Sequence, residues 1–312
     1  MNRNAERRKP ELRERRLGLS YSSPMGLWFT IFFVAPLAII ILYSFLKRGL
    51  YGGVEWEFSL TAYKQMFNAN FGKVLVRTIW ISVVATLGCI LLALPTGYAM
   101  ARSKRQTLLL FLIIIPFWTN SLIRIYAWIS ILSTEGFLNE ILKALGLVDE
   151  GLHLIYNHGS VILVLIYMYL PFAVLPLFTT IDKFDFSLLD AARDLGATKF
   201  GAIRKVMLPN IRSGLVTAVI FTFIPIFGAY TVPLLVGGKD STMIGNIIVD
   251  QVSKTRNWPL ASAFSMILTL ISTIGVIWMM MSSQKEQAQK KVVTNQQKAE
   301  MNIRKHHKGG EA

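Results

Sequence analysis

The stretch DAARDLGATKFGAIRKVMLP, Asp190 to Pro209, is charged, whereas the long segments on both sides of it are apolar and almost free of charge. Ser187, followed three residues later by Asp190, predicts a capping box at the start of a short helix. Gly196 ends that helix, because glycine adopts the left-handed conformation without strain. Thr198 can cap a second helix, which Pro209 stops. The stretch therefore predicts a small helical hairpin between two apolar segments.

Each helix of this hairpin carries an apolar face. The first face has Leu188, Ala192 and Leu195, and the second has Phe200, Ile203 and Met207. A helix of about two turns is marginal in water on its own, so we expect these faces to be buried. Two interpretations remain at this point: the hairpin docks on another protein, or it is a linker that lies on lipid headgroups.

The composition of the whole chain is that of a membrane protein. The 312 residues are 53% hydrophobic and only 16% charged, with a mean hydropathy of +0.46. Soluble domains carry about 25% charged residues, and apolar blocks of about twenty residues match the bilayer core. Six such blocks predict an all-α membrane protein with six transmembrane helices: Gly26–Leu46, Ile79–Met100, Thr107–Ile131, Ser160–Ile181, Ser213–Leu235 and Pro259–Met281.

We interpret the net charge of +15 as a signal of the chain's orientation in the membrane rather than of nucleic-acid binding. Basic residues are concentrated in the two tails and in the loops after the second and fourth spans, whereas the loop after the third span is mainly acidic. The positive-inside rule then places both tails and the hairpin in the cytoplasm. We expect four parts: a basic tail over residues 1–20, a first transmembrane helix over 26–46, the transport domain over 71–281 and a polar tail over 282–312.

Several classes of function lack the residues that they need. The single cysteine, Cys89, lies in an apolar block, and His153 and His158 lie in a loop without metal-site spacing, so we expect them to be solvated. No acidic residue falls in the six blocks, which argues against an ion-coupled carrier. The segment GGKDS, Gly237–Ser241, is not a phosphate-binding loop. We therefore expect no catalytic residues, no metal and no ATP site of the chain's own.

The spacing within the hairpin resembles a known motif. Asp190-Ala191-Ala192, Gly196, Val206 and Leu208-Pro209 are similar to the EAA loop of ATP-binding-cassette (ABC) importer permeases. That pattern is Glu-Ala-Ala, three residues, Gly, nine residues, Ile, one residue and Leu-Pro. Asp190 replaces its Glu and Val206 its Ile, and the shorter Asp puts in question any contact that needs the reach of Glu.

This resemblance implies a type I ABC importer permease, or MetI-like, fold in which the loop is a cytoplasmic coupling helix. It also implies the partners: an ATPase dimer that binds the ATP, a second permease subunit that is a distinct chain, an extracytoplasmic substrate-binding protein and the lipid bilayer. The chain itself would bind no cofactor and no nucleic acid. Its place would be the cytoplasmic (inner) membrane of a bacterium, as a multi-pass protein.

Three further stretches indicate the cargo. Pro116–Asp149, Gly237–Val252 and Arg256–Ala263 resemble the corresponding parts of spermidine/putrescine permeases, most of all the first permease subunit of such importers. The likeness extends over roughly residues 71–281 and implies polyamine transport. The alternatives are the same machine with thiamine, ferric iron, sulfate or a phosphonate as cargo, an ATP-independent carrier or channel, and a membrane enzyme.

A flexible polycation needs aromatic faces and carboxylates along its path. Residues near the outer ends of the spans provide candidates: Trp118, Tyr126, Trp128, Tyr169, Phe227, Tyr230, Asp250 and Trp258. The aromatic residues also fit the interfacial belt of membrane proteins, and Asp250 also fits a solvated loop. Arg124, close to several of them, would repel a polycation. It could pair with an acidic residue of a docked binding protein or anchor at the membrane interface.

Overall fold

The computed structural model describes residues 23–67 and 69–281, so both predicted tails lie outside the described residues. The described chain forms two compact units. One comprises residues 23–67 and 248–267, and the other comprises residues 69–247 and 268–281. The predicted boundaries of the first transmembrane helix and the transport domain remain a prediction.

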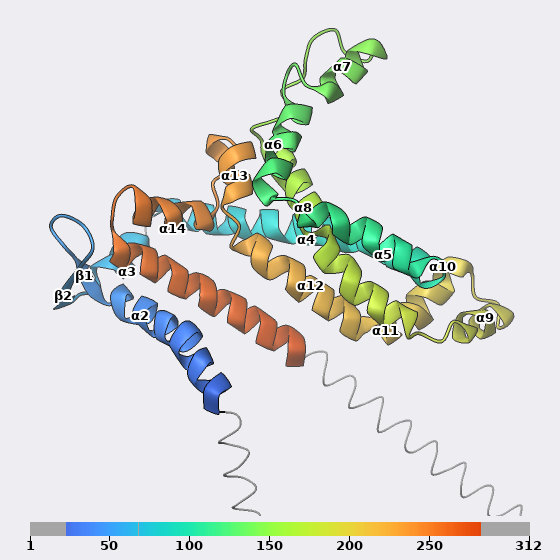
Figure 1. The fold of residues 1–312 in the computed structure, drawn as a ribbon, viewed down its shortest axis with the longest axis horizontal. Helices are drawn as coiled ribbons and strands as arrows, with labels where there is room; N and C mark the ends of the chain where they lie inside the picture. The colour runs from blue at the N-terminus through green and yellow to red at the C-terminus, as the bar shows by residue number, and fades with distance from the viewer. Residues whose placement is uncertain (1–22, 68, 282–312) are drawn as a thin grey trace, which may run out of the picture. The chain divides into compact units, whose positions relative to one another are not determined.

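The first unit starts with the helix Ser23–Ser44, which includes the π-helical turn η1 (Thr30–Val34) and α2 (Ala35–Ser44). Two short antiparallel strands follow, β1 (Leu46–Arg48) and β2 (Val54–Phe58), which the sequence did not predict (Figure 1). Helix α3 (Thr61–Met66) completes the N-terminal part of this unit.

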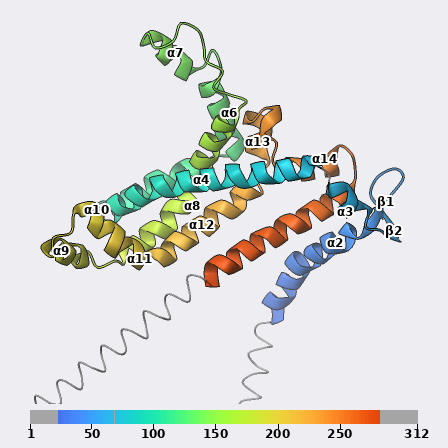
Figure 2. The ribbon, with the colours of Figure 1, turned by 180° about the vertical axis from the view of Figure 1, so that it is seen from behind.

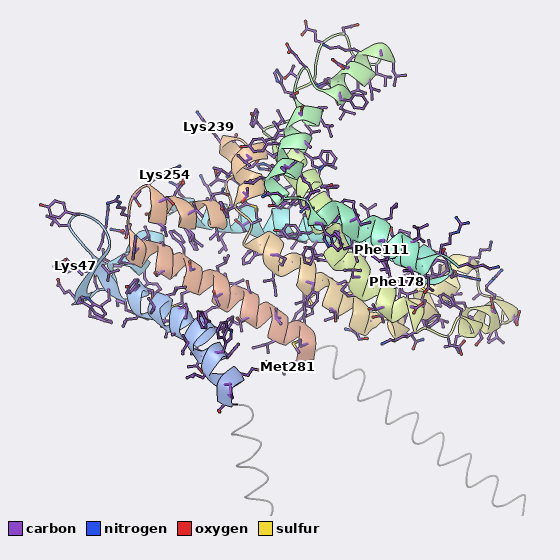
Figure 3. All side chains as sticks on the ribbon, in the orientation of Figure 1. Lys47, Phe111, Phe178, Lys239, Lys254 and Met281 are labelled. Atoms are coloured by element: carbon purple, nitrogen blue, oxygen red, sulfur yellow. The ribbon has the colours of Figure 1, made fainter. Side chains whose placement is uncertain are left out.

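Polar contacts join the N-terminal part of this unit to residues 248–267. The Tyr63 hydroxyl donates to Ser44 Oγ at 2.9 Å and to Met266 Sδ at 3.0 Å. The Arg48 guanidinium donates to the carbonyl of Thr255 at 2.6 Å. At the strands, Lys47 (labelled in Figure 3) forms an exposed ion pair with Glu57 at 2.6 Å.

The second unit contains most of the helices. Its first half runs through α4 (Ala69–Ala101), α5 (Gln106–Ile114), η2 (Ile115–Trp118), α6 (Ser121–Leu132), α7 (Phe137–Ala144) and α8 (His158–Asp182). Its second half runs through α9 (Ser187–Asp194), α10 (Lys199–Ala202), η3 (Ile203–Met207), α11 (Leu208–Asn210), α12 (Arg212–Phe227), α13 (Thr231–Val236) and η4 (Lys239–Ser241). Helix α14 (Ile244–Ser253) and the helix Trp258–Met281 each extend from one unit into the other.

The core of the second unit is formed by α4, α8 and α12, which pack on one another (Figure 2). Ile81 and Ala85 of α4, Leu165 and Leu177 of α8 and Ala218 of α12 are fully buried there. Gly214 lets α12 approach α8 closely, because a Cβ at this position would overlap the side chain of Thr180. Small residues at such crossings are typical of helices that pack in membranes.

The spans confirm the predicted class and correct two boundaries. Within residues 23–67 and 69–281, four helices are long and apolar enough to cross a membrane, and two bent helix pairs raise the number to six if each pair is one span. The predicted span Thr107–Ile131 bends by 90° between Trp118 and Ser121, where Asn120 caps α6 by accepting from the Leu122 N–H at 2.8 Å. The predicted span Ser213–Leu235 is also interrupted, because α12 ends at Phe227 and the chain turns at Gly228.

Candidate functional site

The charged stretch forms a helical hairpin, as predicted. Helix α9 makes its first arm, and α10, η3 and α11 make a continuous second arm from Lys199 to Asn210. Both arms lie at one end of α8 and α12 (Figure 1). The hairpin therefore joins two of the three helices that form the core of the second unit.

The first arm starts differently from the prediction. Ser187 and Asp190 make no capping box, since α9 has no side-chain cap and Asp190 instead pairs with Arg193 at 3.5 Å. Asp185 takes over the role: its carboxylate accepts from the backbone N–H of Ser187 at 3.0 Å. Hydrogen bonds from the side chain and backbone of Ser187 lower the pKa of Asp185 below its ordinary value.

The turn between the arms confirms the role predicted for Gly196, whose φ is 89°. The N–H of Gly196 donates to the Arg193 carbonyl at 2.9 Å, and the N–H of Ala197 donates to the Ala192 carbonyl at 3.0 Å. These two bonds are those of a Schellman motif. Thr198 caps the second arm as predicted, accepting from the Gly201 N–H at 3.0 Å.

The second arm does not stop at Pro209. It contains a π-helical turn, Ile203–Met207, and continues through Pro209 to Asn210 before the chain bends by 75° into α12. Pro209 is the second residue of α11, directly after the π-helical turn and one residue before the end of the arm. The bend falls at Ile211, which is 1% exposed.

The residues of the hairpin, including those of the motif, differ in how deeply they are buried. Leu189, Ala202 and Met207 are buried, at 6%, 1% and 3% exposure, and attach the hairpin to the core. Three motif positions, Ala192, Val206 and Leu208, are partly buried and pack against the same core. The other motif positions, Asp190, Ala191, Gly196 and Pro209, are exposed.

The predicted apolar faces are therefore only partly buried. Leu195 is 90% exposed, Phe200 is 74% exposed and Leu188 is 45% exposed. Together with the exposed Ala191, these residues form what we call the hairpin surface. The helical spacing of the apolar residues predicted these faces, but it could not show that the folded unit leaves them exposed to solvent.

The hairpin is also held by residues that the sequence did not single out. The Arg102 guanidinium donates to the Tyr98 hydroxyl at 3.1 Å and lies 5.4 Å from the ring of Phe186, which meets Tyr98 edge-on at 5.8 Å. The hydrogen bond to Tyr98, with the nearby Asp190 carboxylate, raises the pKa of Arg102. Tyr98 and Arg102 are one helical turn apart, but no local pattern could have paired them with Phe186, which is distant in the chain.

A second connection lies beside this aromatic contact. The Gln106 side-chain amide donates to the Asp182 carboxylate at 2.9 Å and to the Ala101 carbonyl at 3.0 Å. It thereby joins the end of α8, where the hairpin begins, to the end of α4 and the start of α5. A displacement of the hairpin would be transmitted to α4 and α8 through these contacts.

Six of the eight candidates for the cargo path belong to the second unit. Trp128 meets Tyr167 edge-on at 5.4 Å, and Tyr167 lies 5.9 Å from Phe117, whose ring carries the Arg124 guanidinium at 4.4 Å. Two further candidates, Trp118 and Tyr126, are 78% and 58% exposed. Aromatic rings therefore lie on and beside α6 and α8, and the ring of Phe117 already contacts the guanidinium of Arg124.

The remaining candidates differ in exposure and in partners. Tyr169 lies 5.9 Å from the ring of Phe172 on α8. Phe227 is fully buried and stacks on Phe223, so it contributes to helix packing, whereas Tyr230 is 44% exposed.

Asp250 and Trp258 belong to the first unit, whereas the other six candidates belong to the second. The predicted loop around Asp250 is instead helix α14, in which the Asp250 carboxylate pairs with Lys254 at 2.8 Å. Trp258 lies 6.2 Å from the ring of Tyr43.

Comparison with known proteins identifies the family. Residues 90–286 match the model of the binding-protein-dependent transport system inner membrane component. The chain belongs to this family. This permease is 39% identical over 246 residues to the spermidine/putrescine transport system permease protein PotB of Salmonella typhimurium, covering 78% of this chain and 86% of that protein. It is 34% identical over 249 residues to PotB of Haemophilus influenzae, covering 79% and 87%.

A solved structure supports the same fold. The permease matches the crystal structure of a bacterial ABC transporter involved in the import of the acidic polysaccharide alginate with a TM-score of 0.72, covering 89% of this chain and 99% of that one at 16% identity. The resemblance predicted from the sequence is confirmed: the permease is a multi-pass inner membrane component and a homologue of PotB.

Proposed function

We propose that this permease imports polyamines, spermidine or putrescine, in a machine powered by ATP that a separate ATPase dimer binds. The observation that carries the proposal is the 39% identity to PotB over 86% of that relative's length, because PotB is named for spermidine/putrescine transport. The chain would supply half of the membrane channel and bind no nucleotide itself. Its tails and its hairpin would lie in the cytoplasm.

The hairpin surface supports a mechanical role at the ATPase. Leu188, Ala191, Leu195 and Phe200 offer apolar area to a partner, while Leu189 and Met207 fix the hairpin to the core. Docking of this surface would couple closure of the ATPase dimer to the hairpin. The Arg102–Phe186 and Gln106–Asp182 contacts would then carry the motion to α4 and α8. Alternating access of this kind is a rigid-body movement of helices.

The motif residues would serve this coupling in two ways. Asp190, Ala191, Gly196 and Pro209 would lie at or beside the ATPase, and Ala192, Val206 and Leu208 would keep the arms in place. The shorter side chain of Asp190 is already engaged with Arg193 at 3.5 Å, which leaves the apolar residues as the main contact.

The cargo path would pass aromatic residues of the second unit. Trp118, Tyr126 and Tyr230 are exposed, Trp128 and Tyr169 are partly buried, and all five have rings that could contact ammonium groups. Asp250 and Trp258, in the first unit, are separate candidates for contact with the cargo. The full burial of Phe227 favours a packing role for that residue. A binding protein would capture the polyamine outside and deliver it, and a second, distinct permease chain would complete the channel.

Uptake of labelled spermidine tests this function directly. The complete complex of this chain, its partner permease, the ATPase and the binding protein would be reconstituted in liposomes with or without internal ATP. We expect ATP-dependent uptake that unlabelled putrescine competes and thiamine, sulfate or amino acids do not. Uptake without ATP would refute the proposed ATP-driven mechanism. Binding-protein-stimulated ATP hydrolysis without spermidine uptake would refute the cargo alone.

A further inference from the structure

A cleft of about 660 Å³ opens at the beginning of α4, in the second unit. Gly72, Lys73, Val76, Arg77, Trp80 and His158 line it. His158 is not the solvated loop residue that the sequence suggested: it starts α8, its Nδ1 lies 2.6 Å from Ser241 Oγ, and its ring centre lies 6.2 Å from that of Trp80. The cleft therefore has one wall on α4 and another at the first residue of α8.

The charges around this cleft have one sign. Lys73 and Arg77 are four residues apart, hence on the same face of α4, and like charges at this spacing repel. No carboxylate is among the described residues that line the cleft, and the polar contact given for Arg77 is a 3.5 Å hydrogen bond to the Thr242 carbonyl. α8 also begins here, and the N-terminal end of a helix is positive. This arrangement would be favoured by a bound anion.

The cleft lies at the depth of lipid headgroups. Helix α4 has 33 residues, about 50 Å of helix, whereas the hydrocarbon core is about 30 Å thick. The apolar block of this helix starts at Ile79, so Lys73 and Arg77 fall in the two turns before it. Trp80, 49% exposed, stands at the boundary, where tryptophan is common in membrane proteins. Val76, 68% exposed, adds an apolar wall between the two cations.

We propose that this cleft binds an anionic phospholipid, with Lys73 and Arg77 contacting its phosphate. His158 closes the headgroup side, and Val76 and Trp80 contact the start of the acyl chains. A polycationic cargo would be repelled by the same cluster, so the site is not assigned to polyamine. The lipid site also stands independently of the proposed cargo, because its test measures lipid binding rather than transport.

The test compares lipids on the purified importer complex. The delipidated complex would be titrated with phosphatidylglycerol or with phosphatidylethanolamine, and bound lipid would be counted by native mass spectrometry. We expect phosphatidylglycerol to bind more tightly than phosphatidylethanolamine. The variant Lys73→Gln/Arg77→Gln should weaken the phosphatidylglycerol affinity by about fivefold for each cation removed.

Matched variants decide between specific and general charge effects. Lys104→Gln/Lys143→Gln removes the same charge from exposed positions outside the cleft and should leave the affinity unchanged. Lys73→Arg/Arg77→Lys keeps the charge and should retain binding. Equal affinity in the wild type and in Lys73→Gln/Arg77→Gln would overturn the proposal.

Two soluble probes test the other possible occupants. If inorganic phosphate displaces phosphatidylglycerol at similar concentration, the site takes free anions and the lipid assignment is wrong. If the double variant keeps its phosphatidylglycerol affinity but loses stimulation by the binding protein, the cluster contacts that protein instead. Retention of the lipid in the presence of millimolar phosphate would support the assignment.

Discussion

The conformation of the hairpin turn depends on a single residue, Gly196. Its φ of 89° costs other L-residues about 1 to 2 kcal/mol, and proline would also remove the N–H that bonds to Arg193. We expect Gly196→Pro to abolish ATP-driven uptake while the chain still inserts in the membrane, and Gly196→Ala to reduce uptake partially. Uptake in proteoliposomes and hydrogen exchange at the Ala197 amide measure the two effects.

A matched glycine provides the control for this prediction. Gly275 lies in the helix Trp258–Met281 with open space where a Cβ would stand, so Gly275→Ala should be neutral. Wild-type uptake by Gly196→Pro would show that the turn does not transmit the motion of the ATPase.

Asp185 gives the start of the hairpin a defined pH dependence. Its folded pKa is lowered by hydrogen bonds from Ser187, so its contribution is present above the unfolded pKa of about 4 and is lost as the pH falls through the folded value. We expect protection of the Ser187 amide to be constant between about pH 5 and 8 and to fall below about pH 4. Asp185→Asn, which can accept the same bond without titrating, should remove this acid-dependent loss. An identical acid response in both proteins would assign the effect to another group.

Substitutions of buried and of exposed side chains in the hairpin should separate its stability from its docking to the ATPase. Leu195→Glu and Phe200→Glu alter side chains that are 90% and 74% exposed, so we expect normal thermal stability but loss of ATPase binding in a pull-down assay. Leu189→Ala removes a buried side chain and should destabilise the hairpin by about 2 to 5 kcal/mol. Leu147→Glu, at a 66% exposed position after α7, is the control and should bind the ATPase normally. Normal ATPase binding by both hairpin variants would place the contact elsewhere.

The sequence predicted the helices well and their interruptions poorly. Hydropathy measures how apolar a segment is, so it identified the apolar blocks around α5–α6 and α12. It contains no information on the direction of the helix axis within a block. At the 90° bend the Asn120 side chain accepts a backbone hydrogen bond, and Pro116 together with the polar pair Thr119-Asn120 inside an apolar block was the local signal. The β1–β2 pair was missed although Val54–Phe58 alternates apolar and acidic residues directly after Gly52-Gly53, because the three-residue β1 has no periodic pattern of its own.

The hairpin shows the same division between local and distant causes. Gly196 and Thr198 were predicted because glycine turns and threonine caps act within a few residues. Asp185 was missed because Ser187 offered an equally good cap in the sequence, and only the backbone geometry selects between them. The exposure of Leu195 depends on which surfaces the whole unit covers, which no local pattern states.

The molecule as a whole connects one end of its spans to the other through α4, α8 and α12. The anchor of the hairpin, formed by Tyr98, Arg102 and Phe186, lies at the end of α4, whereas the proposed lipid cleft lies at its beginning. Because α8 and α12 are closely packed at Gly214 and Thr180, and both pack on α4, we expect a force at the hairpin to move the three helices together. This arrangement suits a subunit that converts an external force into alternating access.

The topology that this mechanism requires can be tested on the whole chain with one reactive thiol at a time. The only cysteine, Cys89, is fully buried, so the native chain provides a low background for a membrane-impermeant maleimide. Lys183→Cys lies at the exposed end of α8 beside the hairpin, and Leu147→Cys lies in the acidic segment after α7. The positive-inside rule predicts that Lys183→Cys reacts only in inside-out vesicles and Leu147→Cys only in right-side-out cells. The reverse pattern would put the hairpin on the side without ATP, and coupling through the hairpin surface would then be impossible.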